Sequence, residues 1–176
     1  MKSTGVVRRV DKLGRIVIPK EIRRNLKIRE EDNLEIFIDS ESIILKKYSL
    51  FSRFNTVIDG ICDVIHGITG KHVVITDMEK VMVCNSQLDS IYKDKELDEK
   101  FVNLIDRRET LISNEKLSFN IVNVEDKEKY YFFNPIIING EIIGSIVIFS
   151  YDNSISNDDK LIIKFVLKYL EKNIED

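Results

Sequence analysis

The sequence predicts an α+β protein built from two parts, a small N-terminal domain of the order ββαββ and a larger domain in which helices flank an antiparallel sheet. Two observations lead to this prediction. Short alternating apolar runs between turn residues crowd the first 50 residues, whereas helical spacing and strand patterns alternate beyond them. The charge divides at the same place, because residues 1–50 carry 12 Lys and Arg against 8 Asp and Glu, a net of +4, and residues 51–176 carry 15 against 22, a net of −7.

The N-terminal part begins with a predicted hairpin followed by a short helix. Residues 6–10 and 15–18 alternate as strands do, and Gly14 supplies the backbone freedom that the turn between them needs. A helix is expected after Pro19, with Ile22 and Leu26 four residues apart on one face. The last two strands, joined by a polar tip, are expected at residues 34–39 and 43–47.

The first 50 residues contain too few large apolar side chains to form a core of their own. The stretch "VRRVDKLGRIVIPKEIRRNLKI" instead carries eight basic residues. A unit of this size buries too little apolar surface to offset its chain entropy, so we expect it to take the rest of its core from a second copy. Such a homodimer repeats every arginine about a two-fold axis, which is the symmetry of a pseudo-palindromic DNA duplex.

A linker helix over residues 51–70 is expected to lead into a second domain of residues 71–176. Apolar residues from Phe54 to Ile65 recur at steps of three and four, and the helix should stop at Gly67 or Gly70. Shorter elements follow in the chain. Strands are predicted at 72–77 and 80–85, a helix near 97–108 and a weaker strand at 119–122.

The C-terminal 50 residues hold the clearest pattern. Asn139-Gly140 lies between two apolar β-branched runs, which predicts a hairpin of two long strands. Ser156, followed by Asp158 and Asp159, predicts the capped start of a final helix. That helix is apolar on more than one face, and the surplus favours a second helix-packing interface between subunits, which would make a homotetramer.

The stretch from residue 3 to residue 48 resembles the AbrB-type swapped-hairpin domain. The resemblance rests on the turn glycine and the arginine after it, on "IPKEIRR" and on the closing "IILKKY". It implies that two chains interleave their hairpins into one small barrel that binds double-stranded DNA. The second part resembles a GAF-like domain through "NPIIINGEIIGSIVIF", although its helix and strand order would also suit a PAS-like domain. The "NKFDE" signature of cyclic-nucleotide GAF domains is missing, so no cyclic nucleotide is expected.

The resemblance implies four DNA-contacting arginines. They fall on Arg8, Arg15, Arg23 and Arg24, and the guanidinium fork of arginine suits guanine and phosphate. The further basic candidates are Arg9 and Lys20, with lesser claims for Lys12, Lys46 and Lys47. Arg8 and Arg9 should point to opposite faces of a strand, and we favour Arg8 for the DNA face. The plain alternative is that these charges only keep a dimer surface soluble.

Motifs for catalysis or cofactor binding are not found in the sequence, and we expect no enzyme, no metal and no cofactor. The two histidines, His66 and His72, lack partners at metal-ligand spacing, and the seven glycines form no phosphate loop. Cys62 and Cys84 favour buried thiols, with thiol chemistry at Cys84 as an idea to test. The N-terminus has no signal core and no apolar run is long enough to span a membrane, which predicts a cytoplasmic protein without a membrane partner.

The resulting functional hypothesis is a transcriptional regulator of sporulation that activates and represses genes. The resemblance implies this role and a location in the forespore. The second domain is expected to oligomerise and is a candidate sensor of a small molecule, with the linker helix as the coupling element. The alternative is an architectural or antitoxin-like DNA-binding protein whose second domain only oligomerises.

Overall fold

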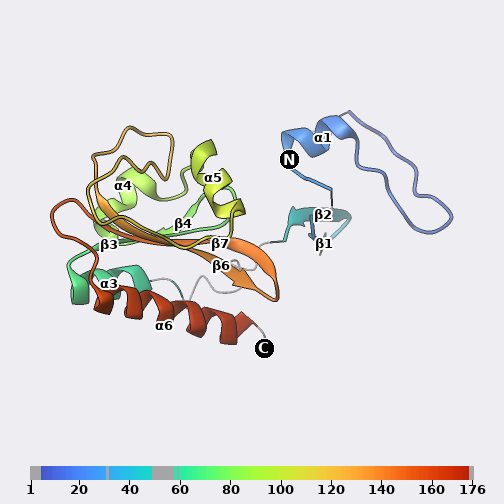
Figure 1. Ribbon diagram of the computed structural model, residues 1–176. Coiled ribbons are helices and arrows are strands. Elements are labelled where there is room, and N and C mark those ends of the chain that lie inside the picture. Colours follow the sequence, from blue (N-terminus) through green and yellow to red (C-terminus); the bar gives the residue numbers. More distant parts are fainter. Residues whose placement is uncertain (1–4, 31, 49–57, 59, 175–176) are drawn as a thin grey trace. The chain divides into compact units, whose positions relative to one another are not determined.

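The structure is a computed structural model that describes residues 5–30, 32–48, 58 and 60–174 (Figure 1). The chain divides into two compact units, Met1–Tyr48 and Ser49–Asp176. We call them the N-terminal unit and the C-terminal unit and describe each by itself. The part of the predicted linker helix at residues 51–57 lies outside the described residues. No helix among the described residues is long and apolar enough to cross a membrane.

The N-terminal unit contains one short helix and one hairpin. Helix α1 spans Lys20–Asn25 and begins directly after Pro19, as expected. Strands β1 (Leu34–Asp39) and β2 (Ser42–Lys47) pair in antiparallel register. These three elements were predicted from the sequence, and the structure confirms them. The prediction succeeded because local turn and proline signals define their ends.

The predicted strands at 6–10 and 15–18 are not strands in this chain. The turn between them does form, since Asp11 N–H donates to the Arg15 carbonyl at 3.0 Å and Gly14, with φ +78°, donates to the Asp11 carbonyl at 3.0 Å. A strand needs a neighbouring strand to complete its ladder and cover its apolar side chains. The N-terminal unit supplies no such neighbour for these residues, and Val7 and Val17 remain 85% and 74% exposed.

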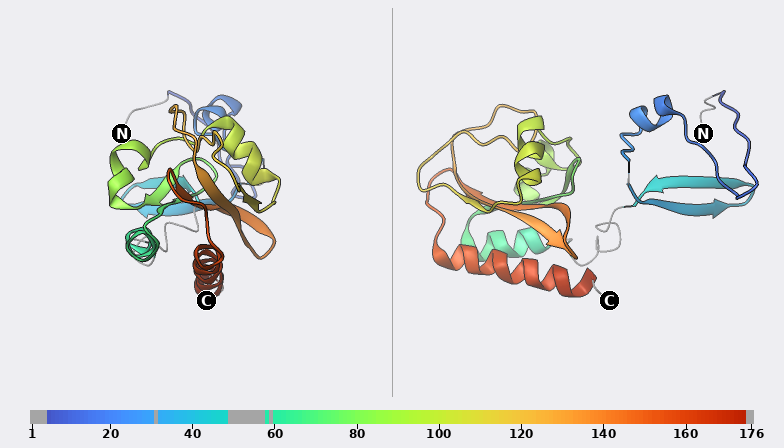
Figure 2. Two further views of the ribbon diagram at one scale, coloured as in Figure 1. Left: turned by 60° about the vertical axis from the view of Figure 1, so that its left-hand side comes forward. Right: turned by 45° about the vertical axis from the view of Figure 1, so that its right-hand side comes forward.

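The C-terminal unit is built on a five-stranded antiparallel sheet of order β4-β3-β7-β6-β5 (Figures 1 and 2). Its strands are β3 His72–Thr76, β4 Val81–Cys84, β5 Leu111–Ile112, β6 Tyr130–Ile138 and β7 Glu141–Ser150. Its helices are α3 Ile61–Thr69, the 3-10 turn η1 Ser86–Leu88, α4 Asp89–Tyr92, α5 Glu99–Asp106 and α6 Asn157–Ile174. Helices α3 and α6 lie on one face of the sheet, and α4 and α5 lie on the other.

Two apolar cores follow from this three-layer arrangement. One lies between the sheet and helices α3 and α6, with Cys62 and Ile163 among its buried residues. The other lies between the sheet, helices α4 and α5 and the segment around Phe119, and it contains Phe101 and Phe133. A sheet covered on both faces explains why strands β3 and β7 contain the continuous apolar runs 73–75 and 146–149 rather than a strict alternation.

The strongest sequence signals of this unit are confirmed. Asn139 and Gly140 have φ of 50° and 81°, the pair of positive values that a two-residue hairpin turn of type I′ requires. Helix α3 ends at Gly70 in a left-handed conformation. Helix α6 starts in a reciprocal cap, in which Asp159 N–H donates to Ser156 Oγ at 3.1 Å and Ser156 N–H donates to Asp159 Oδ2 at 2.7 Å.

The weak strand predicted at 119–122 is wrong. Only a single bridge between Leu97 and Val122 forms there. Phe119 and Ile121 are buried in the second core without a strand partner, so the apolar pattern of this segment reflects packing against α5 and the sheet.

Candidate nucleic-acid interface

Asp11 organises the turn between residues 11 and 15 and holds the Arg15 side chain. One carboxylate oxygen accepts the backbone N–H groups of Leu13 and Arg15, at 2.9 and 2.8 Å. The other accepts Arg15 Nε–H at 2.7 Å. The hydrogen bonds from Arg15 lower the pKa of Asp11, so it stays ionised at neutral pH. Because this pairing uses Nε, the two terminal nitrogens of Arg15 remain directed donors for a second anion.

Helix α1 carries Lys20, Arg23 and Arg24. Lys20 and Arg24 are exposed, whereas Arg23 is half-buried. The Nε of Arg23 is buried and finds no acceptor among the described residues. A buried N–H group without an acceptor is costly, so the Arg23 Nε–H is a donor that a further acceptor would stabilise.

Arg8 and Arg9 precede the turn, and both are exposed. Arg8 donates from Nη1 to its neighbouring Val7 carbonyl at 3.2 Å. The expected separation of the two side chains onto opposite faces depends on a strand that this chain does not form alone. The preference for Arg8 over Arg9 therefore stays a prediction.

All six candidates thus lie in the N-terminal unit. Arg8, Arg9 and Arg15 lie in the segment before Pro19, and Lys20, Arg23 and Arg24 lie on α1. Their contacts to DNA stay predictions. The lesser basic candidates on β2 have partners within the unit, since Lys46 Nζ lies 4.9 Å from the centre of the Phe37 ring and Lys47 Nζ lies 3.3 Å from Asp32 Oδ2. Such contacts hold them on the β1–β2 hairpin, and their lower ranking stays a prediction.

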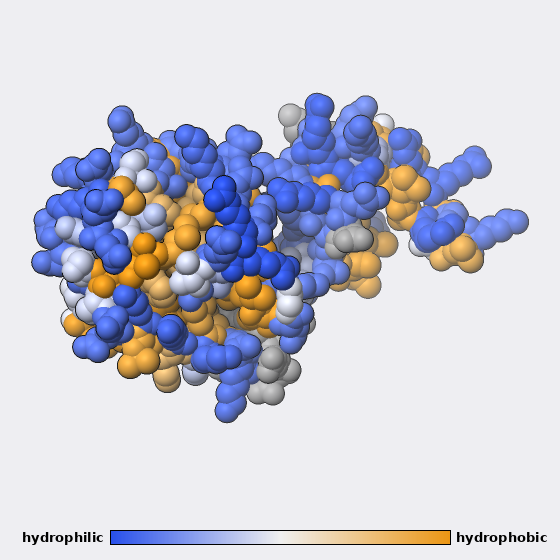
Figure 3. All heavy atoms as spheres, viewed as in Figure 1, coloured by the Kyte–Doolittle hydropathy of each residue, from blue (hydrophilic) through white to orange (hydrophobic). Residues whose placement is uncertain are grey.

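The N-terminal unit leaves its apolar side chains uncovered. None of its described residues is buried. On the β1–β2 hairpin, Ile36 faces Leu45 and Ile38 faces Ile43, so four aliphatic side chains gather on one face, and Ile38 is 83% exposed. Figure 3 shows further apolar side chains along this unit. We call the surface formed by Ile36, Ile38, Ile43 and Leu45 the hairpin face, and we expect a second copy to cover it.

The C-terminal unit also exposes an apolar surface, on helices α3 and α6. Ile68 is 70% exposed and Phe165 is 71% exposed, although each helix buries its other side in the core. We call this surface the helix face, and it consists of Val64, Ile68, Leu161 and Phe165. Figure 3 shows apolar side chains among the polar ones on the surface of this unit. The surplus apolar positions predicted for the last helix are therefore real.

The interior of the C-terminal unit holds a charged side chain that the sequence analysis passed over. Lys129 is fully buried, and its ammonium lies 4.4 Å from the centre of the Phe149 ring. It pairs with Asp126 and donates to Tyr92 Oη at 3.2 Å. Asp126 also accepts from Tyr92 and, at 3.0 Å, from Tyr151. In "EDKEKYYFF" this lysine resembles ordinary surface charge, so only tertiary packing reveals it.

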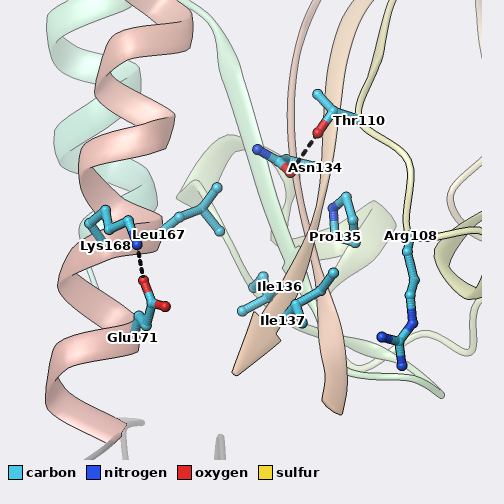
Figure 4. A pocket seen from close by; sticks show the side chains of 9 residues that line it. All are labelled: Arg108, Thr110, Asn134, Pro135, Ile136, Ile137, Leu167, Lys168 and Glu171. Atoms are coloured by element: carbon cyan, nitrogen blue, oxygen red, sulfur yellow. Dashed lines mark hydrogen bonds and ion pairs between the residues drawn. The ribbon is translucent and has the colours of Figure 1, made fainter. Parts of the chain in front are cut away.

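A hollow of about 300 Å³ lies between β6 and α6 (Figure 4). Most of its polar groups already have partners, since Thr110 Oγ1 donates to Asn134 Oδ1 at 2.9 Å and Lys168 pairs with Glu171. Pro135 lies in the same wall and lacks a backbone N–H. Few directed groups remain free for a ligand in this hollow.

The cysteines and histidines of the C-terminal unit lie in or next to its interior. Burial, and then Asp89, raise the pKa of Cys84 to about 12, and its thiol lies 3.5 Å from Asp89 Oδ1. This disfavours the reactive thiolate and weakens the idea of thiol chemistry there. His66 and His72 stack with ring centres 5.2 Å apart. Nowhere in the described part of the chain do three His, Cys, Asp or Glu side chains gather as metal ligands would.

Comparison with known proteins identifies both units. The family described as stage V sporulation protein T C-terminal, transcription factor, matches residues 54–175, and the family described as antidote-toxin recognition MazE, bacterial antitoxin, matches residues 7–51. Stage V sporulation protein T of Bacillus subtilis (strain 168) is 36% identical over 177 residues, covering 99% of both chains. The chain therefore belongs to the stage V sporulation protein T family of transcription factors.

Two further similarities agree with the two-unit architecture. The transition state regulatory protein AbrB of Bacillus subtilis (strain 168) is 69% identical over 48 residues, which are 27% of this chain and 50% of that protein. A crystal structure of a GAF domain/HD domain protein from Geobacter sulfurreducens is 10% identical, covers 73% of this chain and 93% of that one, and has a TM-score of 0.51. The C-terminal unit thus has a GAF-like fold, and the chain is a sporulation transcriptional regulator with an AbrB-type N-terminal domain.

Proposed function

We propose that the N-terminal unit binds double-stranded DNA as a homodimer through Arg8, Arg15, Arg23 and Arg24. The observation that carries the proposal is a unit without a single buried residue among those described, which exposes both an apolar hairpin face and several arginine side chains. Apolar surface of this kind marks a protein interface, and basic surface marks a polyanion partner. Arg9 and Lys20 lie beside this set and complete the proposed surface.

Arg15 and Arg23 have the geometry that such a site needs. Asp11 fixes the Arg15 guanidinium and leaves its terminal nitrogens available. Arg23 holds a buried Nε–H that lacks an acceptor among the described residues. A phosphate oxygen or a carbonyl of the second copy would satisfy it, so dimer formation and DNA binding both relieve the same unpaired group.

Fluorescence anisotropy with a duplex selected by the wild-type protein from a random pool tests this proposal. Arg23→Ala should weaken binding by about tenfold or more, the loss expected for a directed contact. Arg24→Ala, if Arg24 contacts only phosphate, should weaken all sequences alike and lower the slope of log affinity against log salt by about one. Arg29→Ala, an exposed arginine of the same unit outside the proposed set, is the matched control. Equal affinities for Arg23→Ala and Arg29→Ala would remove Arg23 from the site.

We further propose that the helix face joins two such dimers into a homotetramer. Two aliphatic and aromatic rows on adjacent helices can pack against the same rows of another copy as helices do in bundles. Phe165→Asp should convert tetramers to dimers in sedimentation velocity, because a carboxylate would be buried without a partner. Ile91→Asp, at an exposed isoleucine outside the helix face, should leave the assembly unchanged. Tetramers in both variants would contradict this interface.

The proposed biological role is activation and repression of genes during sporulation, in the cytoplasm of the forespore. The C-terminal unit is proposed to add small-molecule sensing to assembly. A non-sensing scaffold is the competing function, and the filling of the domain interior by Lys129 and its aromatic neighbours favours it. An antitoxin-like role draws support from the family match at residues 7–51 only, whereas the match at 54–175 favours the regulator.

A further inference from the structure

A second hollow, of about 310 Å³, lies beside helix α5. We call it the α5 pocket, and its lining combines an apolar floor with a polar rim. The lining residues are Asp98, Lys100, Phe101, Leu104, Arg107, Ser118, Phe119 and Asn120. Its volume lies in the range of small-ligand sites, and its three apolar lining residues are joined by five polar or charged ones.

The floor of the α5 pocket is fixed by contacts that exist without a ligand. Phe119 stacks on Tyr131 with ring centres 3.9 Å apart, and the Phe101 ring meets Phe119 edge to face at 5.6 Å. The start of α5 is anchored because Asp98 N–H donates to the Ile121 carbonyl at 2.9 Å. Phe101 and Phe119 are buried, so the floor is a rigid aromatic surface.

Two cations lie on the rim. Lys100 and Arg107 are seven residues apart on and at the end of α5, so they project from the same side. Both are exposed, and within the described part of the chain neither side chain forms an ion pair. Asp98 is the one acidic lining residue, and its Oδ1 already accepts the Lys100 backbone N–H at 2.8 Å as the helix cap. The rim therefore carries an excess of positive charge.

Asn120 contributes the group that needs a ligand most. Its side-chain Oδ1 is buried and has no hydrogen-bond donor among the described residues. Buried carbonyl oxygens are nearly always paired in folded proteins, since an unpaired one loses its hydration without compensation. A donor that enters the α5 pocket would supply the missing bond.

We infer that the α5 pocket binds a small organic carboxylate that also carries an N–H donor and an apolar body. The carboxylate pairs with Lys100 and Arg107, the N–H donates to Asn120 Oδ1, and the apolar body packs on Phe101 and Phe119. Inorganic phosphate would satisfy only the rim, and a hydrocarbon only the floor. The inference rests on the sensing role proposed above for the C-terminal unit and names the class of its effector.

The contrast with the hollow between β6 and α6 supports this choice. There the polar side chains bond to one another, as Thr110 does to Asn134 and Lys168 to Glu171 (Figure 4). In the α5 pocket the described residues provide no such partners for Lys100, Arg107 and Asn120 Oδ1. Unpaired charged and polar groups around an apolar floor can bind a ligand of complementary chemistry.

Isothermal titration of the full-length protein with hippurate tests the inference. Hippurate joins a carboxylate, an amide N–H and a phenyl ring, and it should bind with a Kd of about 1 mM or lower. 3-Benzoylpropionate replaces only the N–H by a methylene group and hippuramide only removes the charge, so each should bind at least about tenfold more weakly. Absence of hippurate binding at about 20 mM, or equal affinity for all three compounds, overturns the inference.

Two sets of variants locate the binding. The double substitution Lys100→Gln and Arg107→Gln should weaken hippurate binding by about tenfold or more, whereas Arg108→Gln, the same change at the neighbouring position, should not. Asn120→Leu should abolish the preference for hippurate over 3-benzoylpropionate while raising the thermal midpoint, because it removes the unpaired oxygen. Equal weakening by Arg108→Gln would place the carboxylate outside the α5 pocket.

The same samples separate this inference from the proposed DNA function. DNA affinity of the ligand-free protein depends on the N-terminal arginines and should be the same for wild type and Lys100→Gln/Arg107→Gln. If DNA binds and hippurate does not, the ligand inference fails and the DNA proposal stands. If hippurate binds and the selected duplex does not, the DNA proposal fails and the pocket stands.

Discussion

The two units of this chain contrast in how each treats its apolar side chains. The C-terminal unit buries aliphatic and aromatic residues in two cores on either side of its sheet. The N-terminal unit buries none of its described residues and exposes Ile36, Ile38 and Ile43 on one face of its hairpin. The difference teaches that one unit can fold by itself, whereas the other is an incomplete fold until a second copy supplies the rest of its core.

The largest effect is expected from Gly144→Ala in the C-terminal unit. A Cβ at this position of β7 would lie 1.9 Å from the Thr76 carbonyl oxygen and 2.9 Å from Asp77 Cα, and backbone on a neighbouring strand cannot give way. We expect a loss of about 4 kcal/mol or more in the free energy of unfolding, measured by urea denaturation. Gly67→Ala is the control, because a Cβ there meets nothing within 4 Å and should be neutral or slightly stabilising.

Ile38→Asp tests the N-terminal half of the comparison. In a monomeric unit a carboxylate at this exposed position would cost little, but in the dimer it is buried without a partner and should cost about 3 kcal/mol or more. Circular dichroism should show the N-terminal transition lost and the C-terminal one unchanged. Ile91→Asp, at an exposed isoleucine of α4, should stay within about 0.5 kcal/mol of wild type. Stability of Ile38→Asp equal to that control would mean that the N-terminal unit folds without a second copy.

Substitutions in the buried ion pair of Asp126 and Lys129 test which interactions stabilise the C-terminal unit. Asp126→Asn removes the partner of a fully buried ammonium and should cost about 3 kcal/mol. Lys129→Met keeps the side-chain volume among Phe149 and Tyr92, and leaves Asp126 with two tyrosine hydroxyls, so it should cost about 1 kcal/mol or less. Chemical denaturation of both variants compares them directly. Equal losses would show that the lysine contributes through its charge rather than its packing.

The smallest effect is a pH dependence from His72. Burial, followed by the nearby His66, lowers the pKa of His72 below its ordinary value of 6.5. The folded state therefore keeps the ring neutral while the unfolded chain takes up a proton, so stability is complete above pH 6.5 and declines as the pH falls towards the lowered pKa. Since the ring is half-exposed, the decline should be below about 1 kcal/mol.

His72→Phe supplies the comparison for that measurement. The substitution preserves an aromatic ring against Phe149, whose centre lies 5.3 Å from that of His72. Thermal melts of wild type and variant between pH 7 and pH 5.5 should differ in slope, with the variant the flatter of the two. An identical slope would assign the decline to titratable groups other than His72.

Much of the fold could be predicted because local signals are strong where the backbone is special. Asn139-Gly140 predicted the β6–β7 turn and Ser156 predicted the start of α6, since each residue type favours the backbone conformation found there. The end of α3 was predicted at Gly67 or Gly70, and the structure places it at Gly70. The prediction failed at residues 119–122, where an apolar pattern without a turn signal proved to be irregular packed chain. Periodicity reports burial, and burial alone does not define a strand.

The candidate sites also differ in whether the sequence alone could reveal them. The arginines proposed to contact DNA could be chosen from the sequence because their motif is local and resembles a family motif residue by residue. The α5 pocket could not, because Lys100, Arg107 and Asn120 are brought together only by the packing of α5 against the 118–120 segment. Lys129 was missed for the same reason, as its burial depends on Tyr92 and Phe149 from distant elements.

The sequence by itself determined the two-part organisation, the local turns and caps, and the need of the N-terminal unit for a second copy, because charge, periodicity and the supply of apolar residues are properties of composition and order. Only the tertiary structure decided which buried polar atoms lack a partner among the described residues, at Arg23 and Asn120, and which charge is buried, at Lys129. Hydrogen-bond pairing depends on distances between segments far apart in the chain, and those distances exist only once the layers have packed.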